Sequence, residues 1–443
     1  MTPDMSSSAA DYCCENRPAH SDGFLPTGAP GGDPANLKGA PGTDLRLTKI
    51  LFVDDEPAMI RVLKMGMRSM ANEWDMQFAE GGEQALELVN KEVFDVVVTD
   101  MRMAGINGAQ LLNHVLRRTP QTVRIILSGY ADLSEVVSCV GLTHQFLTKP
   151  CSLDDLKSCL RKVTGIKAKL THEKLRSLTG GMTSLPSIPE LYLEIAEALQ
   201  SQSTSSERIA EIACKDPALS AKLLQIANSA FFGFSRKVYS VDEAVQMLGV
   251  GVIHSLAMAV PLFTAFDRKK CPGFHIDQVW EHSAEVASIA RRIYNEHLDD
   301  SHRAQQAFAA GIMHDIGKLI IADNLSAQYA VILAEAKATN TELHKVERKH
   351  LDATHAEIGA YLLALWGLPV PLVEAVACHH MPRRCCTSTL CLAGVIHIAD
   401  ALQHTQGLHP ELTANPVDAE YLKQTGLDTH YETWRANLNR RED

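Results

Sequence analysis

Acidic, hydroxyl and amine side chains recur in the first part of the chain, each directly after a short apolar run. Clustered carboxylates repel one another and therefore favour a hard divalent cation such as Mg²⁺. A carboxylate held beside that cation can attack phosphorus, while the metal and a nearby ammonium neutralise the phosphoryl oxygens. The spacing therefore predicts a site for phosphoryl transfer to a carboxylate, built from Asp54, Asp55, Asp100, Ser128 and Lys149.

These groups can meet only if the apolar runs are neighbouring strands. Between residues 48 and 165 the runs "KILFVDD", "DMQFAE", "FDVVVTD", "VRIILSG" and "QFLTKP" alternate with helical patterns. Strand–helix alternation with continuous apolar strands predicts a doubly wound five-stranded parallel sheet covered on both faces, here over residues 47–165. The carboxyl ends of such strands share one edge, where ligands bind.

A second set of polar residues lies in the later, helical part of the chain. Imidazole and carboxylate groups on facing helices can bind one or two metal ions such as Fe, Mn or Zn and activate a water molecule. The alternative is that each is a hydrogen-bonded core residue, and we assign His254, His297, His344 and His397 to that class. Burying the remaining polar groups without partners would be costly. The predicted cluster comprises His282, His314, Asp315, His355, His379, His380 and Asp400.

The rest of the chain divides by composition. Residues 1–46 are rich in Gly, Pro, Ser and Ala and are expected to be disordered. Residues 166–182 are predicted to be a helical linker that continues a stripe of leucines. The stripe is either only the last amphipathic helix of the first domain, packed on its own sheet, or its extension also connects or dimerises the two halves. The helical periodicity of residues 183–410 predicts an all-α domain. Residues 411–443 are expected to form a short helical appendage.

Charge and cysteine content narrow the class of protein. The net charge of −11 argues against a general nucleic-acid surface, so no direct DNA binding is expected. The most apolar run contains His254 and Pro261 and is short for a bilayer, so no membrane insertion is expected. The 11 cysteines include no CxxC pair, which suits neither a disulfide framework nor a zinc ribbon and indicates a reducing cytoplasm.

The first half resembles the receiver domain of two-component response regulators. The resemblance is carried by "ILFVDDEP", "DVVVTDMRMAGINGAQLL", "IILSGYAD" and "FLTKPC". It implies that Asp100 accepts a phosphoryl group from a sensor histidine kinase and that Asp54 and Asp55 hold Mg²⁺ with it. It further implies that Ser128 and Phe146 are switch residues, that Lys149 contacts the phosphoryl group, and that the Lys149–Pro150 peptide is cis.

The second half resembles the HDOD domain, a signalling relative of the HD metal-dependent phosphohydrolases. The segments that carry this resemblance are "ANSAFFG", "MLG", "FAAGIMHDIGKLIIAD" and "LLALWGLPVPLVEAVACHH". The chain departs from the related cyclic dinucleotide phosphodiesterases, because "HHMPRRCC" has no Gly-Tyr-Pro segment. Gln278 also stands where an active binuclear site could use an acid.

Three functions are compatible with this combination, the last of which is an HDOD half that serves only as a dimerisation scaffold. The first is a response regulator whose phosphorylation on Asp100 controls an HDOD domain that binds a downstream protein partner. The second is a receiver-gated metal-dependent phosphohydrolase acting on a cyclic dinucleotide or nucleotide.

Overall fold

The computed structural model describes the two halves of the chain and most of the segments between them. The described residues are 47–128, 142–169, 185–187, 194–195, 198, 205–228, 236–249, 253, 263–265, 270–298, 300–385, 389–405 and 416–439. The expected disordered segment 1–46 and most of the expected linker lie outside this set.

The first half is built on a parallel five-stranded sheet with the order β2-β1-β3-β4-β5. All four strand pairs are parallel, and the central strands β1 and β3 have almost no exposed side chains because helices cover both faces. The predicted doubly wound fold is confirmed. The strands are β1 (Thr48–Val53), β2 (Trp74–Ala79), β3 (Val96–Asp100), β4 (Val123–Ser128) and β5 (Gln145–Thr148).

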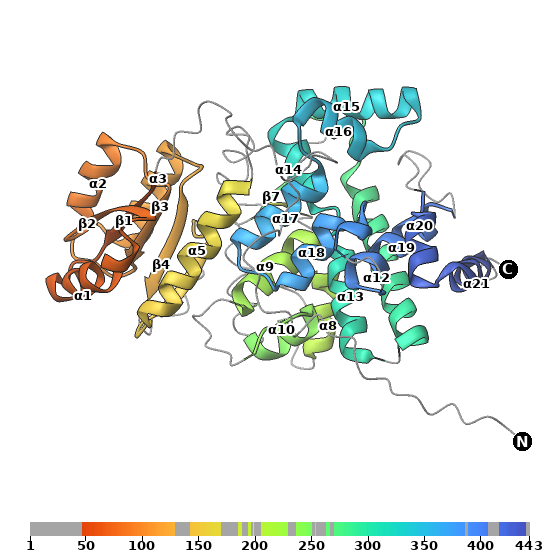
Figure 1. Cartoon of the computed structure of the whole chain (residues 1–443), viewed down its shortest axis with the longest axis horizontal. Helices are drawn as coiled ribbons and strands as arrows, with labels where there is room; N and C mark the ends of the chain where they lie inside the picture. The colour runs from red at the N-terminus through yellow and green to blue at the C-terminus, as the bar shows by residue number, and fades with distance from the viewer. Residues whose placement is uncertain are drawn as a thin grey trace, which may run out of the picture.

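Helices follow the strands and turn the chain back along the sheet. A capping box between Asn107 and Gln110 starts the helix after β3, which fixes the loop that leaves Asp100. Figure 1 shows the helices on both sides of the sheet, with α5 on the side that faces the second half. The elements are α1 (Pro57–Met67), η1 (Arg68–Met70), α2 (Gly82–Lys91), α3 (Gly108–Arg118) and α5 (Leu153–Lys169).

The second half is a helical assembly, as expected, with one short strand pair. β6 (Leu185–Ser187) and β7 (Phe263–Ala265) pair in parallel over three residues each, too few to be recognised by alternation. The helices are α8 (Ser206–Cys214), α9 (Pro217–Ala227), α10 (Val241–Leu248), α12 (Ile276–Leu298), α13 (Ser301–Met313), α14 (Ile316–Asn324), α15 (Ser326–Thr339), α16 (Leu343–Leu351), α17 (His355–Leu365), α18 (Val370–Cys378), η4 (Pro382–Arg384), α19 (Leu392–His404), α20 (Ala419–Thr425) and α21 (Asp428–Asn439).

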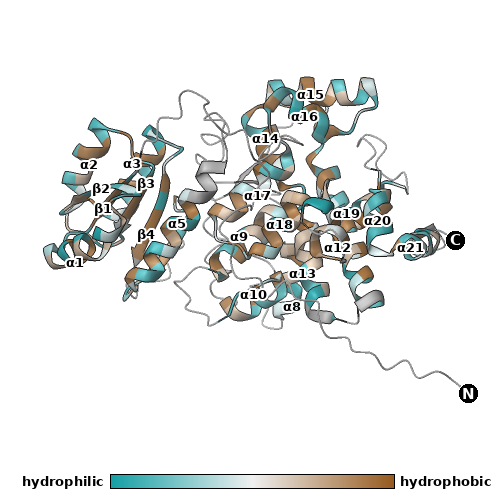
Figure 2. Cartoon of the chain, in the orientation of Figure 1, coloured by the Kyte–Doolittle hydropathy of each residue, from teal (hydrophilic) through white to brown (hydrophobic). Residues whose placement is uncertain are grey.

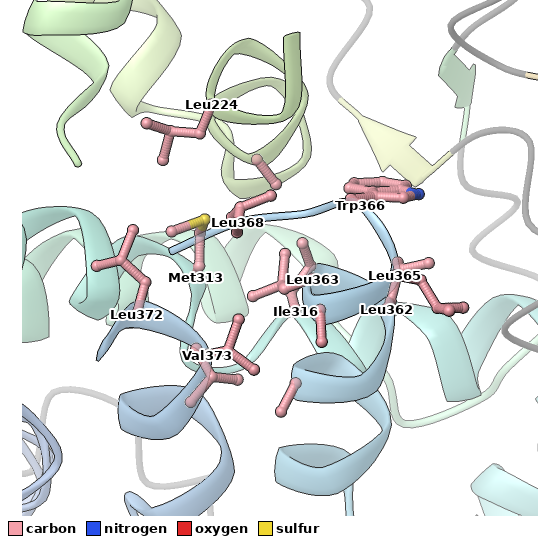
Figure 3. Packing of buried hydrophobic residues seen from close by; sticks show 14 of the residues in the cluster. Leu224, Met313, Ile316, Leu362, Leu363, Leu365, Trp366, Leu368, Leu372 and Val373 are labelled. Carbon is pink, nitrogen blue, oxygen red and sulfur yellow. The ribbon is translucent and has the colours of Figure 1, made fainter. Parts of the chain in front are cut away.

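The core of the helical half lies where α9, α13, α14, α17 and α18 meet. Figure 2 shows apolar residues on the inward sides of these helices and hydrophilic residues on the outer helices α15 and α16. Figure 3 shows Met313, Ile316 and Leu363 of α17 in one cluster of buried side chains together with Leu224 of α9 and Leu368. Each of these five side chains is at most 3% exposed. Burying them provides the main stabilisation of this half.

Two details of the chain bear on earlier expectations. The Lys149–Pro150 peptide is cis, as the receiver resemblance implied. Cys378 and Cys385 form a disulfide across the turn that follows α18, a pairing that we did not predict, because the cysteines do not suggest a disulfide framework. The turn brings their Cα atoms within 6.5 Å, which sequence spacing alone does not reveal.

Among the described residues, no helix has the length and apolarity needed to span a membrane.

Candidate phosphorylation site and candidate metal centre

The strand-end carboxylates of the first half gather around one lysine. Asp54 follows β1, Asp100 is the last residue of β3, and Lys149 follows β5. The Lys149 Nζ atom lies 2.7 Å from Asp54 Oδ2 and 2.8 Å from Asp100 Oδ2. Although burial alone would lower the pKa of Lys149, hydrogen bonds and charges from Asp100 and Asp54 outweigh it and raise this pKa. The lysine is therefore a fixed positive charge beside Asp100.

The donor set fits a divalent cation. One carboxylate oxygen from each of Asp54, Asp55 and Asp100 lies within 4.8 Å of the others. Three carboxylates facing one ammonium leave an excess of about two negative charges, which is the charge that Mg²⁺ would neutralise. Backbone amides hold the carboxylates in place: Glu56 N donates to Asp54, Ala104 N to Asp55, and Met101 N to Asp100.

The site borders a cavity rather than the packed core. A cavity of about 490 Å³ adjoins Asp55 and the loop that follows Asp100, so the site is open on the side of Asp55. It is lined by Asp55, Met101, Arg102, Met103, Ala104, Asn107 and Ala109.

The two expected switch residues are only partly described. Ser128 ends β4 and pairs with Thr148 in the sheet, but its side chain lies outside the described set. Phe146 is the second residue of β5, the strand that leads to Lys149, and is 3% exposed.

The seven predicted His and Asp residues of the helical half converge on Asp315. The Asp315 Oδ2 atom lies 3.4 Å from His314 Nε2 and 3.6 Å from His282 Nε2. Its other oxygen lies 3.2 Å from His355 Nε2 and 3.9 Å from His379 Nε2.

The remaining two members close the cluster on either side. Asp400 Oδ1 is 3.2 Å from His282 Nε2, and His380 Nε2 is 2.9 Å from His355 Nε2. Asp315 thus presents one oxygen to each of two histidine groups. All members are buried except His380, which is half-buried.

Each of these residues is positioned by a helix end or a helix face. His314 and Asp315 lie between α13 and α14, His379 and His380 directly follow α18, and the other three lie within helices. The capping box of Thr354 and Glu357 begins α17, so His355 is its first residue.

The tautomers indicated by the hydrogen bonds fit a metal ion. His314 Nδ1 donates to Gly311 O at 2.7 Å, and His379 Nδ1 donates to Val376 O at 2.8 Å. Because a carbonyl oxygen only accepts, each Nδ1 carries the proton and each Nε2 presents a lone pair. Both Nε2 atoms are buried without a hydrogen-bond partner among the described residues. Burial lowers the pKa of both histidines, which keeps them in the neutral form that binds metal.

Four further residues contact the cluster and were missed by the sequence analysis. Lys318 Nζ lies 2.5 Å from Asp315 Oδ2, and His404 Nδ1 lies 3.0 Å from Asp400 Oδ1. Both follow a cluster aspartate by one helical turn, so helical spacing could have found them. The third and fourth are Glu347 and Gln403, which contact His355 and His282.

Glu347 orients His355 from a fully buried position. It accepts from the His355 backbone N–H at 2.8 Å, from His355 Nδ1 at 2.7 Å and from Tyr329 Oη at 3.0 Å. Nothing in the charged stretch "HKVERKH" distinguishes it from an exposed residue. Such a carboxylate–histidine pair fixes the ring and its tautomer, as is common around metal ligands.

The histidines assigned to the core have mixed outcomes. His397 donates from Nδ1 to His379 O at 2.7 Å and accepts from Asp418 N at 2.8 Å through Nε2, so it is a hydrogen-bonded core residue. His344, in contrast, stacks on the ring of His380 with centroids 4.2 Å apart, at the edge of the cluster. His254 and the side chain of His297 lie outside the described set.

Comparison with known proteins agrees with both halves. Residues 50–161 match the response regulator receiver domain family, and residues 185–382 match the HDOD domain family. The fold and the strand-end site thus define a receiver domain followed by an HDOD domain. The chain belongs to the response regulators that carry an HDOD output domain.

Individual relatives cover the chain only in part. An uncharacterised protein of Treponema pallidum (strain Nichols) is 25% identical over 66% of this chain and 55% of its own length. The transcriptional regulatory protein GlrR of Escherichia coli (strain K12) is 30% identical over 29% of this chain and 28% of its own length. The structure of the MmoQ response regulator from Methylococcus capsulatus str. Bath is 24% identical, covers 57% of this chain and 98% of that one, and has a TM-score of 0.44.

The family defines general properties of cofactors and partners. Receiver domains generally bind Mg²⁺ and typically work with sensor histidine kinases, and HD-type domains can bind metals.

Proposed function

We propose that Asp100 is the phosphoacceptor of this response regulator and that a sensor histidine kinase supplies the phosphoryl group. The contact of one ammonium, Lys149, with both Asp54 and Asp100 carries this proposal, because it holds a neutralising charge beside the attacking carboxylate. Asp54, Asp55 and Asp100 would hold the Mg²⁺ ion, whose role when bound is to offset charge on the phosphoryl oxygens.

The transfer step follows from these positions. An oxygen of Asp100 attacks phosphorus, an O–P bond forms, and the N–P bond of the kinase phosphohistidine breaks, returning its electron pair to the imidazole. The product is an acyl phosphate on Asp100. Lys149 can donate a hydrogen bond to a phosphoryl oxygen, and Ser128 and Phe146 are the residues we propose to change position in response.

The output of this step is the HDOD domain. We propose that it acts by binding a downstream protein partner rather than DNA, in the cytoplasm, and that homodimers can form through the linker at 166–182. The domain boundaries that we propose are 47–165 for the receiver and 183–410 for the HDOD domain.

Intact-mass measurement after incubation with acetyl phosphate and Mg²⁺ tests the proposal. The wild type should gain the mass of one phosphoryl group, and Asp100→Asn should gain none. Asp154→Asn is a matched control, because its side chain is 97% exposed and lies outside the site, and it should be labelled like the wild type. Equal labelling of Asp100→Asn would rule out this assignment.

A second candidate function is receiver-gated metal-dependent phosphohydrolysis. It is favoured by the buried Nε2 atoms of His314 and His379 beside Asp315, which have no hydrogen-bond partner within the part of the chain that the structure describes. We propose His282, His314, Asp315, His355, His379, His380 and Asp400 as the residues that would hold Fe, Mn or Zn. A bound ion there would supply an activated water.

Two features favour binding without turnover. Asp315 is 1% exposed, and Gln278 replaces an acid that a binuclear site could use. Elemental analysis of the purified protein discriminates the candidates: less than about a tenth of an equivalent of Fe, Mn and Zn together would discard the hydrolase. Retained metal would justify assays with cyclic di-GMP, with His314→Ala and Asp315→Ala as controls.

A further inference from the structure

The receiver and the HDOD domain are joined by a contact at the end of β5 remote from the phosphorylation site. Gln145, the first residue of β5, donates from Nε2 to the backbone oxygen of Leu365 at 2.6 Å. Leu365 is the last residue of α17. Gly367 has a φ of +78° and a Cβ placed there would lie 2.8 Å from Gln145 Nε2, so glycine permits this close approach. The contact links the strand that leads to Lys149 with the end of a buried helix.

Polar groups from both domains extend this contact. Lys222 of α9 lies 3.7 Å from the centre of the Trp366 ring and donates to Gln225 Oε1 at 3.1 Å. Gln225 Nε2 is 3.4 Å from the backbone oxygens of Thr143 and His144, directly before β5. The interface therefore relies on directional contacts rather than on apolar area alone.

A buried lysine of the HDOD domain lies at this interface. Lys222 is 2% exposed, and burial, together with the positive charge of Arg124 in the receiver, lowers its pKa to about 7. Separation of the domains would return Lys222 to water, where its charged form is again favoured. The contact is thus suited to being made and released rather than to being permanent.

Helix α17 connects this interface to the histidine cluster. Its last residue accepts from Gln145, and its first residue is His355. Midway, Gly359 packs on Gly317 of α14 so closely that a Cβ on Gly317 would lie 1.9 Å from His355 O. Figure 3 shows Leu362, Leu363 and Leu365 of this helix together with Ile316, the residue after Asp315. Because this packing leaves no slack, a movement of α17 is passed on to His355 and to α14, the helix that begins directly after Asp315.

We propose that α17 transmits the phosphorylation state of the receiver to the His/Asp cluster through the Gln145–Leu365 contact. This rests on the proposed phosphorylation of Asp100. Phosphorylation places a phosphoryl group between Asp100 and Lys149, which are 2.8 Å apart without it, and so displaces Lys149 and β5. This displacement weakens the hydrogen bond from Gln145 to α17 and alters the position of His355. By reciprocity, a ligand that fixes the cluster also changes the receiver's equilibrium.

Hydrogen exchange measured by mass spectrometry, with and without acetyl phosphate, tests this coupling on the full chain. In the wild type, phosphorylation should raise the exchange rate of peptides covering 142–148 and 363–368 by about fivefold or more. In Gln145→Ala the exchange should be high in both states while Asp100 is labelled normally. Gly367→Ala crowds the same contact and should show the same high exchange in both states as Gln145→Ala.

The outcomes separate the coupling from the proposed function. Gln424→Ala is the matched control, since its exposed amide donates to Glu420 on its own helix, and it should respond like the wild type. A wild type that is labelled on Asp100 without any change in these peptides overturns the coupling alone. A phosphorylation response that survives intact in both Gln145→Ala and Gly367→Ala overturns it as well. A wild type that takes no label removes the proposed function, and the coupling with it.

Discussion

Replacing Glu347 by glutamine removes one charge from the buried partner of His355 and keeps its shape. Burial alone would lower the pKa of His355, but the charge of Glu347 and hydrogen bonds to Asp315 and Glu347 raise it to about 9. The rise of this pKa from its ordinary value of 6.5 means that protonated His355 stabilises the folded state by about 3 kcal/mol. We expect Glu347→Gln to lose most of this, about 2–3 kcal/mol of unfolding free energy, in metal-free protein.

The sign of the pH dependence follows from the raised pKa. Stabilisation by a group whose pKa is raised on folding is complete below its unfolded pKa and disappears as pH rises through the folded value. The difference between wild type and Glu347→Gln should therefore be largest below the unfolded pKa of 6.5 and shrink as pH passes about 9.

Urea unfolding in chelator, followed by circular dichroism at about pH 6 and about pH 9.5, measures this difference. Glu432→Gln is a suitable control, because its carboxylate is 67% exposed and faces Arg435 in α21, and it should leave stability unchanged. A destabilisation of equal size at both pH values would refute the reasoning, and so would one below about 0.5 kcal/mol at the lower pH.

Three further substitutions test other parts of the account. Lys149→Met should slow labelling of Asp100 by roughly 100-fold, because it removes the charge beside the attacking carboxylate. Lys91→Met is the control, since Lys91 is 71% exposed, and it should be labelled at the wild-type rate. Equal labelling rates of Lys149→Met and the wild type, measured by intact mass, would count against the role of Lys149. Gln403→Leu removes the acceptor that lies 2.8 Å from His282 Nδ1. We expect the metal affinity, measured by competition with a chelator, to fall about tenfold. An unchanged metal affinity would show that His282 needs no hydrogen-bond partner at Nδ1. Gly317→Ala should cost about 2–3 kcal/mol in thermal unfolding, since its Cβ would collide with His355 O; a cost near zero would mean that α14 and α17 can separate easily.

The sheet could be predicted from sequence because its central strands have continuous apolar runs. Residues 50–53 and 96–98, which precede Asp54 and Asp100, are apolar and at most 1% exposed, as expected for strands buried on both faces. Parallel strands necessarily bring their carboxyl ends to one edge, so the contacts of Lys149 with both aspartates follow from topology. The seven His and Asp residues of the helical half were also identified as a set, since buried imidazole and carboxylate groups require partners.

What sequence could not supply are contacts that depend on tertiary packing. Glu347 lies among charged neighbours and has no pattern that marks it as buried, yet it is fully enclosed. Gln145 and Leu365 are separated by 220 residues, and neither is unusual in its own segment. The β6–β7 pair is too short to leave a period, and the Cys378–Cys385 disulfide depends on how one turn closes.

The position of the phosphoryl group tests the central claim most directly. Protein treated with acetyl phosphate and Mg²⁺ can be digested, and the modified residue located by tandem mass spectrometry. The account predicts one acyl phosphate, on Asp100, that forms only when Mg²⁺ is present and is absent from Asp100→Asn. A phosphoryl group found on another residue, or one formed equally well in a chelator of Mg²⁺, would contradict it.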